Sequence, residues 1–205
     1  TDIQPTIEKL GVTKWVKSMV GVEATTTEMG HFNGFPLKYD NDSTNHGMFF
    51  WQTLSPDEIF EQLRNGGKYS PDETIVQLNH PREYGMGYFT QFGFDSKTGN
   101  NSRGIFPWEL LSLDFDAMEI LNGKRYEQVH HFRVPEKFEG KLPDFPLPKA
   151  GEILRDPDTK EIAFPGTLHD WFNLLNQGLR VIAVGNSDSH HLDKQEVGNP
   201  RTFFY

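Results

Sequence analysis

Apolar and polar residues alternate in short blocks along the chain, and the blocks predict strands connected by helices. Five segments have the β-branched content and the alternating or continuous apolar pattern of strands: 20–26, 31–39, 74–81, 117–123 and 180–188. Three segments have helical spacing or helix end signals: 2–19, 55–67 and 167–178. The first two strands are expected to pair antiparallel. The remaining order of strands and helices favours an α/β fold with a mainly parallel sheet.

Local signals place the ends of the helices and one irregular region. In the helix at 55–67, Ser55 is the expected N-cap, Glu58 completes a capping box with it, and two glycines end the helix. Thr167 is the expected cap of the last helix. Residues 83–107 are rich in glycine and aromatic side chains without any period, which predicts a long loop.

The chain is expected to form one domain, residues 1–205, because this length supports a single sizeable core. The proline-rich segment of mixed charge around 124–166 predicts an irregular insertion packed on that domain. Both ends are expected to be truncated, since the chain begins without Met and stops within the strand-like stretch GNPRTFFY.

Composition narrows the classes of function. The net charge is −9, from 20 basic and 29 acidic residues, and no cluster of Lys and Arg offsets it, so nucleic acid is not an expected partner. The chain contains no cysteine, which excludes disulfides, thiolate metal sites and thiol nucleophiles. No apolar run is long enough to cross a membrane. The excess of carboxylates suits the binding of metal cations.

Candidate chemistry gathers at the ends of the predicted strands. In α/β folds, functional groups lie at the carboxyl ends of strands, where loops and helix N-termini converge. Five carboxylate or imidazole side chains occupy such positions: Glu23, His31, His80, Asp188 and His190. They are a ligand set for Zn²⁺, Mn²⁺ or Fe. Asp188 and His190 would point the same way in extended backbone, and Glu23 on a neighbouring strand could bridge two ions.

Each of these residues also has a simpler interpretation. His31 follows a glycine and could be a surface turn histidine, and His80 could bond to backbone at the end of its strand. Asp188 and His190 could cap the next segment. Glu23 needs a partner or an exposed edge, because a buried unpaired carboxylate is costly. The other four histidines are expected to be structural or surface residues: His46, His130, His131 and His169.

Three further residues are candidates for contacting a substrate. Arg82 and Arg201 follow ligand-rich or Gly-Pro segments and could bind a phosphate or carboxylate bidentately, although an ion-paired surface Arg is the commoner role. His191 stands beside the predicted ligand pair and could act as a general acid or hold a substrate oxygen. A surface role for His191 is equally compatible. The aromatic residues of 83–107 could wall a pocket or pack in the core.

Four segments together resemble one family. They are GVEATTTEMGHFNGFP (21–36), QLNHPR (77–82), DAMEILNG (116–123), and GNSDSHH with GNPRT (185–191 and 198–202). They resemble the PHP (polymerase and histidinol phosphatase) domain family, in the branch of metallohydrolases that includes carbaryl hydrolase. The resemblance implies a distorted (β/α)7 TIM-like barrel of α/β class with two or three divalent metal ions at the carboxyl ends of its strands.

The same resemblance implies a role for each candidate ligand. Glu23 would be the bridging carboxylate, His31 and His80 would share one metal, and Asp188 and His190 would be a closing Asp-x-His pair reaching different metals. PHP domains begin with a strand that carries His-x-His, and that motif is absent from these 205 residues. The first strands of the barrel are therefore expected before residue 1, and the site as given could hold one metal weakly or none.

The implied activity is hydrolysis by metal-bound hydroxide, most often of phosphoesters. The expected partner is a small anionic or ester substrate. Two alternatives stay open: hydrolysis of a carboxyl or carbamate ester, and a truncated domain that binds a ligand without turnover. A nucleic-acid enzyme is disfavoured by the net charge of −9.

Overall fold

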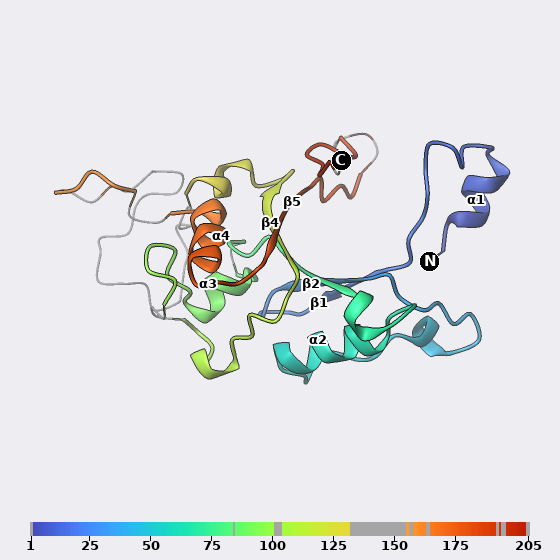
Figure 1. The fold of residues 1–205 in the computed structure, drawn as a ribbon, viewed down its shortest axis with the longest axis horizontal. Coiled ribbons are helices and arrows are strands. Elements are labelled where there is room, and N and C mark those ends of the chain that lie inside the picture. The colour runs from blue at the N-terminus through green and yellow to red at the C-terminus, as the bar shows by residue number, and fades with distance from the viewer. Residues whose placement is uncertain are drawn as a thin grey trace.

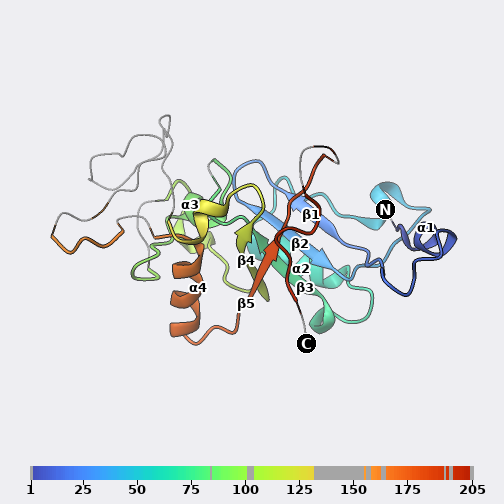
Figure 2. The same ribbon diagram turned by 90° about the horizontal axis from the view of Figure 1, so that it is seen from above.

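The fold is built on one open sheet. A computed structural model describes residues 2–83, 85–100, 104–131, 155, 158–162, 165–191, 193 and 196–203. The sheet has five strands in the order of the chain: β1 (Val22–Thr25), β2 (His31–Phe35), β3 (Ile75–Asn79), β4 (Ala117–Asn122) and β5 (Ile182–Asn186). Figures 1 and 2 show it as a twisted sheet whose outer strands lie at opposite edges.

The predicted (β/α)7 barrel is wrong. Closing a barrel requires the two edge strands to pair, but β1 pairs with β2 and β5 pairs with β4 among the described strands. A β/α unit also returns the next strand parallel to the last. Here β2 and β3 are antiparallel, although α2 (Pro56–Asn65) connects them. The structure is a small mixed α/β fold.

Strand direction divides the sheet into two halves. β1, β2 and β3 pair antiparallel, which confirms the predicted antiparallel pair at the start of the chain. β3, β4 and β5 pair parallel. The expectation of a mainly parallel sheet was therefore wrong. The turn at 26–30 reverses the chain between β1 and β2, and the connection that contains α2 reverses it again between β2 and β3.

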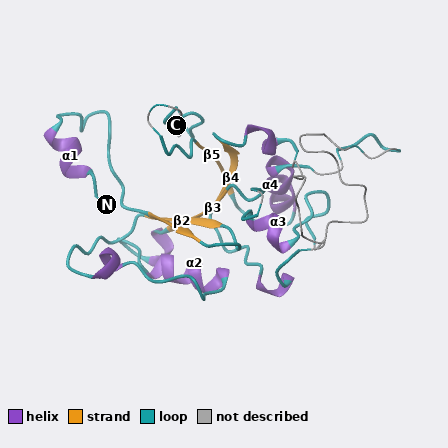
Figure 3. Ribbon diagram, turned by 180° about the vertical axis from the view of Figure 1, so that it is seen from behind, coloured by secondary structure: helices purple, strands orange, loops and turns teal. Residues whose placement is uncertain are grey.

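The core lies on one face of this sheet. Side chains alternate along β2, so Phe32 is buried while His31 and Asn33 point to the other, polar face. The apolar face packs on α2, which Figure 3 shows lying along β2 and β3. The buried residues of this core include Ala24, Phe32, Ile59, Phe60, Leu63, Val76, Leu78 and Met118.

Two helix caps were predicted, and one is confirmed. Ser55 Oγ accepts the N–H of Glu58, and the Glu58 carboxylate accepts the N–H of Ser55 at 2.7 Å, so α2 begins with a capping box. The predicted cap at Thr167 is wrong. α4 (Thr167–Asn176) begins after Gly166 without a side-chain cap, because the Thr167 hydroxyl donates to the carbonyl of Ile120 at 2.7 Å instead.

The segment predicted as a long loop contains a short helix, α3 (Tyr88–Phe92). Three rings of this helix and one ring just after it are buried in the core: Tyr88, Phe89, Phe92 and Phe94. The core interpretation of these aromatic residues is therefore the correct one. Most of the predicted insertion at 124–166 lies outside the described residues.

The remaining short elements lie around this body. α1 (Gln4–Lys9) stands apart from the sheet near the start of the chain (Figure 1). The other elements are single 3-10 turns: Thr44–Gly47, Pro71–Glu73, Trp108–Leu110 and Tyr126–Val129. No described helix is both long enough and apolar enough to cross a membrane.

Candidate metal centre

Because β2 runs opposite to β1 and β3, its first residue lies beside their last residues, and two histidines meet at this end of the strands. His31 begins β2 and pairs with Thr25 at the end of β1 and with Asn79 at the end of β3. His80 follows β3 directly. The rings of His31 and His80 therefore meet edge to face, with their centroids 4.7 Å apart.

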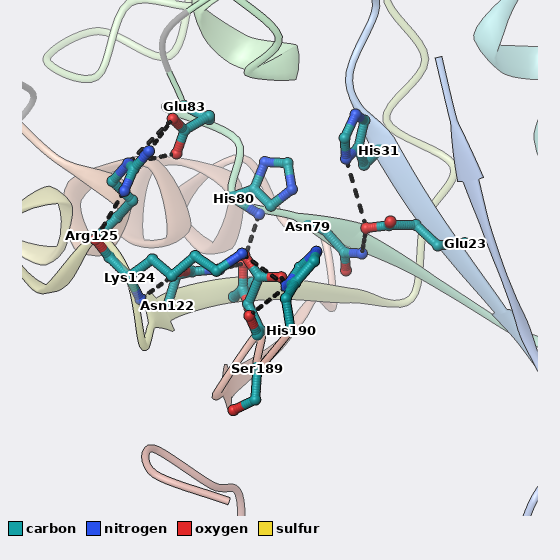
Figure 4. Close-up of polar contacts among 12 residues, drawn as sticks. Glu23, His31, Asn79, His80, Glu83, Asn122, Lys124, Arg125, Ser189 and His190 are labelled. Atoms are coloured by element: carbon teal, nitrogen blue, oxygen red, sulfur yellow. Dashed lines mark hydrogen bonds and ion pairs between the residues drawn. The ribbon is translucent and has the colours of Figure 1, made fainter. Parts of the chain in front are cut away.

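Glu23 reaches these histidines from the polar face of β1. Its Oε1 lies 3.5 Å from His31 Nδ1 and accepts a hydrogen bond of 2.8 Å from Asn79 Nδ2. Its Oε2 accepts a bond from the Thr25 hydroxyl at 3.0 Å. Figure 4 shows Glu23, Asn79 and His31 on one side of the site and His80 beside them.

Glu23, His31 and His80 form a group that could hold a metal ion. One possible ligand atom from each lies within 4.8 Å of the other two. Nitrogen and oxygen ligands bind Zn²⁺ at about 2.0–2.2 Å, so two ligands of one ion lie at most about 4.4 Å apart. Small side-chain movements would therefore suffice to surround one ion.

The pKa shifts of Glu23 and His80 favour the forms of these two side chains that bind metal ions. The hydrogen bond from His31 is the main cause that lowers the pKa of Glu23 to about 2, with Asn79 adding to it and burial opposing it. Burial is the main cause that lowers the pKa of His80 from its ordinary value, and the charge of His31 adds to it. An ionised carboxylate and a neutral imidazole are the forms that bind metal ions.

One buried nitrogen atom of His80 lacks a hydrogen-bond partner. Its side chain is buried, and its Nδ1 has no hydrogen-bond partner among the described residues. Unpaired buried polar atoms are rare in proteins and call for an explanation such as an ion. His80 also has a φ of 25°, and positive φ at a residue other than glycine is often found at functional sites. The donor set and this orphaned nitrogen fit a divalent ion.

The other two predicted ligands are not brought to this group. Lys124 Nζ lies 3.3 Å from Asp188 Oδ2 and 2.8 Å from His190 Nδ1 (Figure 4). Asp188 has a φ of 50°, so the extended backbone assumed for the Asp-x-His pair is absent. The predicted five-ligand set therefore divides in the structure into a group of three and a pair bound to a lysine.

Glu119 is a buried carboxylate that the sequence analysis missed. It is 2% exposed, and burial raises its pKa to about 7. Its Oε2 accepts the backbone N–H of His80 at 2.6 Å and an N–H of Asn122 at 3.1 Å. The signal was present, because Glu119 interrupts an apolar strand just as Glu23 does.

Asn122 connects the two parts of the site. Its Nδ2 donates to Glu119 and, at 3.3 Å, to Asp188 Oδ2. Its Oδ1 accepts the backbone N–H of Lys124 at 2.8 Å. One amide thus fixes the carboxylate behind His80 and the residues that contact His190.

A cavity of about 480 Å³ opens over this edge of the sheet. Its wall includes Glu23, His80, Glu119 and Asp188, and Arg201 is the cationic residue among the described residues that line it. Arg201 is placed there because the hydroxyl of Thr202 accepts the N–H of Gly185 on β5 at 2.9 Å. The remaining polar lining is supplied by amides and hydroxyls: Asn33, Asn79, Asn122, Asn186, Ser187 and Thr202.

Arg82 and His191 are not placed in this cavity. Arg82 is buried elsewhere, where its guanidinium donates to both carboxylate oxygens of Asp170, at 2.7 and 2.6 Å. A guanidinium held in this way is not available to a substrate, so the expectation that Arg82 binds one is not supported. His191 is exposed and is not among the lining residues.

The remaining histidines lie away from the group. His46 stacks on Tyr39, His130 is exposed, and His131 forms an isolated bridge with Pro165. His169 lies on α4 and lines a different cavity. Comparison of the chain with protein-family models, curated proteins and solved structures gives no match.

Proposed function

We propose that this chain is a metal-dependent hydrolase that holds a divalent ion with Glu23, His31 and His80. The observation that carries the proposal is the convergence of these three ligand atoms within 4.8 Å, beside a polar cavity whose lining includes Glu23 and His80. Carboxylate and imidazole ligands without thiolate suit Zn²⁺, Mn²⁺ or Fe. A divalent ion bound there would polarise a phosphoryl or carbonyl oxygen and lower the pKa of a water molecule.

The surrounding residues hold the ligands in place. Asn79 donates to Glu23 Oε1 and accepts at its own Oδ1 from Gln77 Nε2 at 2.8 Å, so the carboxylate is oriented by a chain of amides. Glu119 fixes the backbone N–H of His80. Partners of this kind orient metal ligands and tune their affinity for the ion.

One residue of the cavity lining, Arg201, can bind an anionic substrate. Arg201 offers a forked guanidinium that can bind a phosphate or carboxylate through two hydrogen bonds. The lining residues that the structure describes include no Phe, Tyr or Trp, and only Pro200 and two glycines are non-polar. A flat neutral ester would find little apolar surface here, so a phosphoester is the preferred substrate, in keeping with the resemblance to PHP metallohydrolases.

Metal content and turnover test the proposal together. The purified chain is loaded with Mn²⁺ or Zn²⁺, dialysed, and examined by elemental analysis and with bis(p-nitrophenyl) phosphate, p-nitrophenyl phosphate and p-nitrophenyl acetate. The expected result is about one ion per chain and cleavage of a phosphoester. His80→Gln and His31→Gln should lose both the ion and the activity. The control His169→Gln should keep both, because His169 lies on α4 at another cavity.

Each other outcome excludes a specific part of the proposal. Cleavage of the acetate alone would replace the phosphoester with a carboxyl ester. A bound ion without turnover would indicate a binding domain that is not catalytic. Absence of both ion and turnover, or equal metal content in His80→Gln and His169→Gln, would refute the metal-dependent hydrolase.

A further inference from the structure

Lys124 lies where a carboxylate and an imidazole converge. Its ammonium is 3.3 Å from Asp188 Oδ2 and 2.8 Å from His190 Nδ1. The backbone N–H of Lys124 is fixed by Asn122 Oδ1, so the side chain starts from a defined position just after β4. Figure 4 shows the side chain reaching across the site to His190. The two groups around the ammonium are of the same kinds as those around the proposed metal ion.

The imidazole indicates what kind of cation fits this position. Nδ1 of His190 faces the ammonium of Lys124 at 2.8 Å, and the same nitrogen lies 2.8 Å from the carbonyl oxygen and 3.3 Å from Oδ1 of Asp188. Imidazole nitrogen and carboxylate oxygen are also ligands of Zn²⁺, Mn²⁺ and Fe. The two groups therefore suit a divalent ion as well as an ammonium.

A surface ion pair is the simpler interpretation of Lys124 and Asp188, and such pairs contribute about 0–1 kcal/mol. Two observations favour a more specific role. The side chains of Lys124 and Asp188 are 26% and 25% exposed, which is more buried than an ordinary surface pair. Asn122 also links Asp188 to Glu119 and so to the backbone of His80, which makes the pair part of the site.

The two cation positions lie beside different carboxylates of the cavity. Of the three carboxyl groups that line it, Glu119 has a pKa that burial raises to about 7, so its charge is partial at neutral pH. Glu23 belongs to the group that could hold the ion, and Asp188 lies 3.3 Å from the ammonium of Lys124. Carboxylates in one cavity repel one another, and an ion at Glu23 together with Lys124 at Asp188 places a cation beside each of these two.

We infer that the ammonium of Lys124 occupies a second cation position, so that Asp188 and His190 bind a lysine where they would otherwise bind a second divalent ion. The chain then holds one exchangeable ion with Glu23, His31 and His80, and one fixed positive charge beside it. The inference deepens the proposed function and rests on it only for the first ion. The fixed charge of Lys124 lies 3.3 Å from Oδ2 of Asp188, which lines the cavity.

The number of bound ions tests the inference. Isothermal titration with Mn²⁺ and elemental analysis should give about one ion per chain for the wild type. Lys124→Met keeps the length of the side chain and removes its charge, so it should bind about two. Adding Asp188→Asn to Lys124→Met should return the number to about one. Lys124→Gln provides a second variant with the charge removed, and circular dichroism checks that each variant is folded.

Arg125 offers a matched control. It is the next residue and also pairs with a carboxylate, with its Nε 2.7 Å from Glu83 Oε2. Arg125→Met removes an equal charge next to the site (Figure 4) and should leave the number of bound ions at the wild-type value. A gain of an ion in Arg125→Met as large as in Lys124→Met would overturn the inference.

The failure of this inference is distinguishable from failure of the proposed function. A wild type that binds one ion and a folded Lys124→Met that also binds one would refute the role of Lys124 and leave the first site intact. A wild type that binds two ions would refute it as well. A wild type that binds none, with one ion gained in Lys124→Met, would support the role of Lys124 and refute the Glu23 group.

Discussion

The carboxylate of Glu23 lies 3.5 Å from Nδ1 of His31, and the same oxygen accepts a hydrogen bond from Asn79. These contacts hold the pKa of Glu23 at about 2, so the carboxylate stays ionised over the whole range in which the protein would work. The negative charge facing His31 is therefore permanent, and the affinity of the group for a divalent ion should depend on it.

Replacing Glu23 by Gln tests this dependence. The amide keeps the shape of the side chain and removes its charge, so the affinity for Mn²⁺ or Zn²⁺ should fall by more than about tenfold, the lower end of what is lost when even an outer partner of a metal ligand is removed. Competition with a chromophoric chelator measures the change.

Glu28→Gln is the control for Glu23→Gln. Glu28 is an exposed carboxylate in the turn between β1 and β2, and its loss removes the same charge without touching the group. It should leave the affinity within about twofold, since exposed charges are strongly screened. Equal losses in the two variants would show that net charge, and not the Glu23 carboxylate, governs binding.

The sequence predicted part of this site because some of its signals are local. Glu23 was identified because it is a carboxylate within an apolar strand, and His80 was identified because it lies at the end of a strand. Which strand ends meet depends on strand direction, and the reversal of β2 is decided by its pairing with β1 and β3. His31 was predicted just beyond the first strand, and the structure places it there, at the start of β2 and paired with Thr25 at the end of β1.

The failures arise from contacts that are distant in sequence or from unusual backbone. Asp188 and His190 were treated as extended, but the left-handed backbone at Asp188 and the contact with Lys124 depend on tertiary structure. Arg82 was assigned to a substrate because nothing near it in the sequence identifies Asp170 as its partner. The barrel failed for a similar reason, since strand spacing alone does not fix strand direction.

Glu119 gives a prediction about pH. Burial raises its pKa from 4.5 to about 7 in the folded chain, so the folded state keeps a proton that the unfolded state releases between pH 4.5 and 7. The stability contributed by this group is present below pH 4.5 and is lost as the pH rises towards 7. The loss is on the order of 3 kcal/mol, from a shift of about 2.5 units.

Glu119→Gln removes this titration while keeping an acceptor for His80 and a side chain of the same shape. The free energy of unfolding is measured by urea titration of chelator-treated protein at pH 4.5, 5.5, 6.5 and 7.5. As the pH rises through this range, it should fall more for the wild type than for the variant. Groups far from Glu119 titrate in both proteins and cancel in the difference. Parallel curves for the two proteins would contradict the raised pKa.

Arg82 and Asp170 give the last prediction, which separates a structural role from substrate binding. Their side chains are 7% and 0% exposed, and the pair also contacts the Ser96 hydroxyl. Asp170→Asn leaves a buried guanidinium without its counterion and should lower the free energy of unfolding by about 3–5 kcal/mol. Urea denaturation measures this loss.

The double variant Arg82→Met/Asp170→Leu removes both charges at once, so it should recover much of the stability that Asp170→Asn loses, because the cost of breaking a buried pair comes from the charge left behind. If Arg82 has no part in substrate binding, this double variant should also cleave the phosphoester with the wild-type KM. If the double variant is folded and nearly as stable as the wild type but its KM rises tenfold, Arg82 takes part in substrate binding. An Arg82 that only supports the fold changes the amount of folded protein and leaves KM as it was.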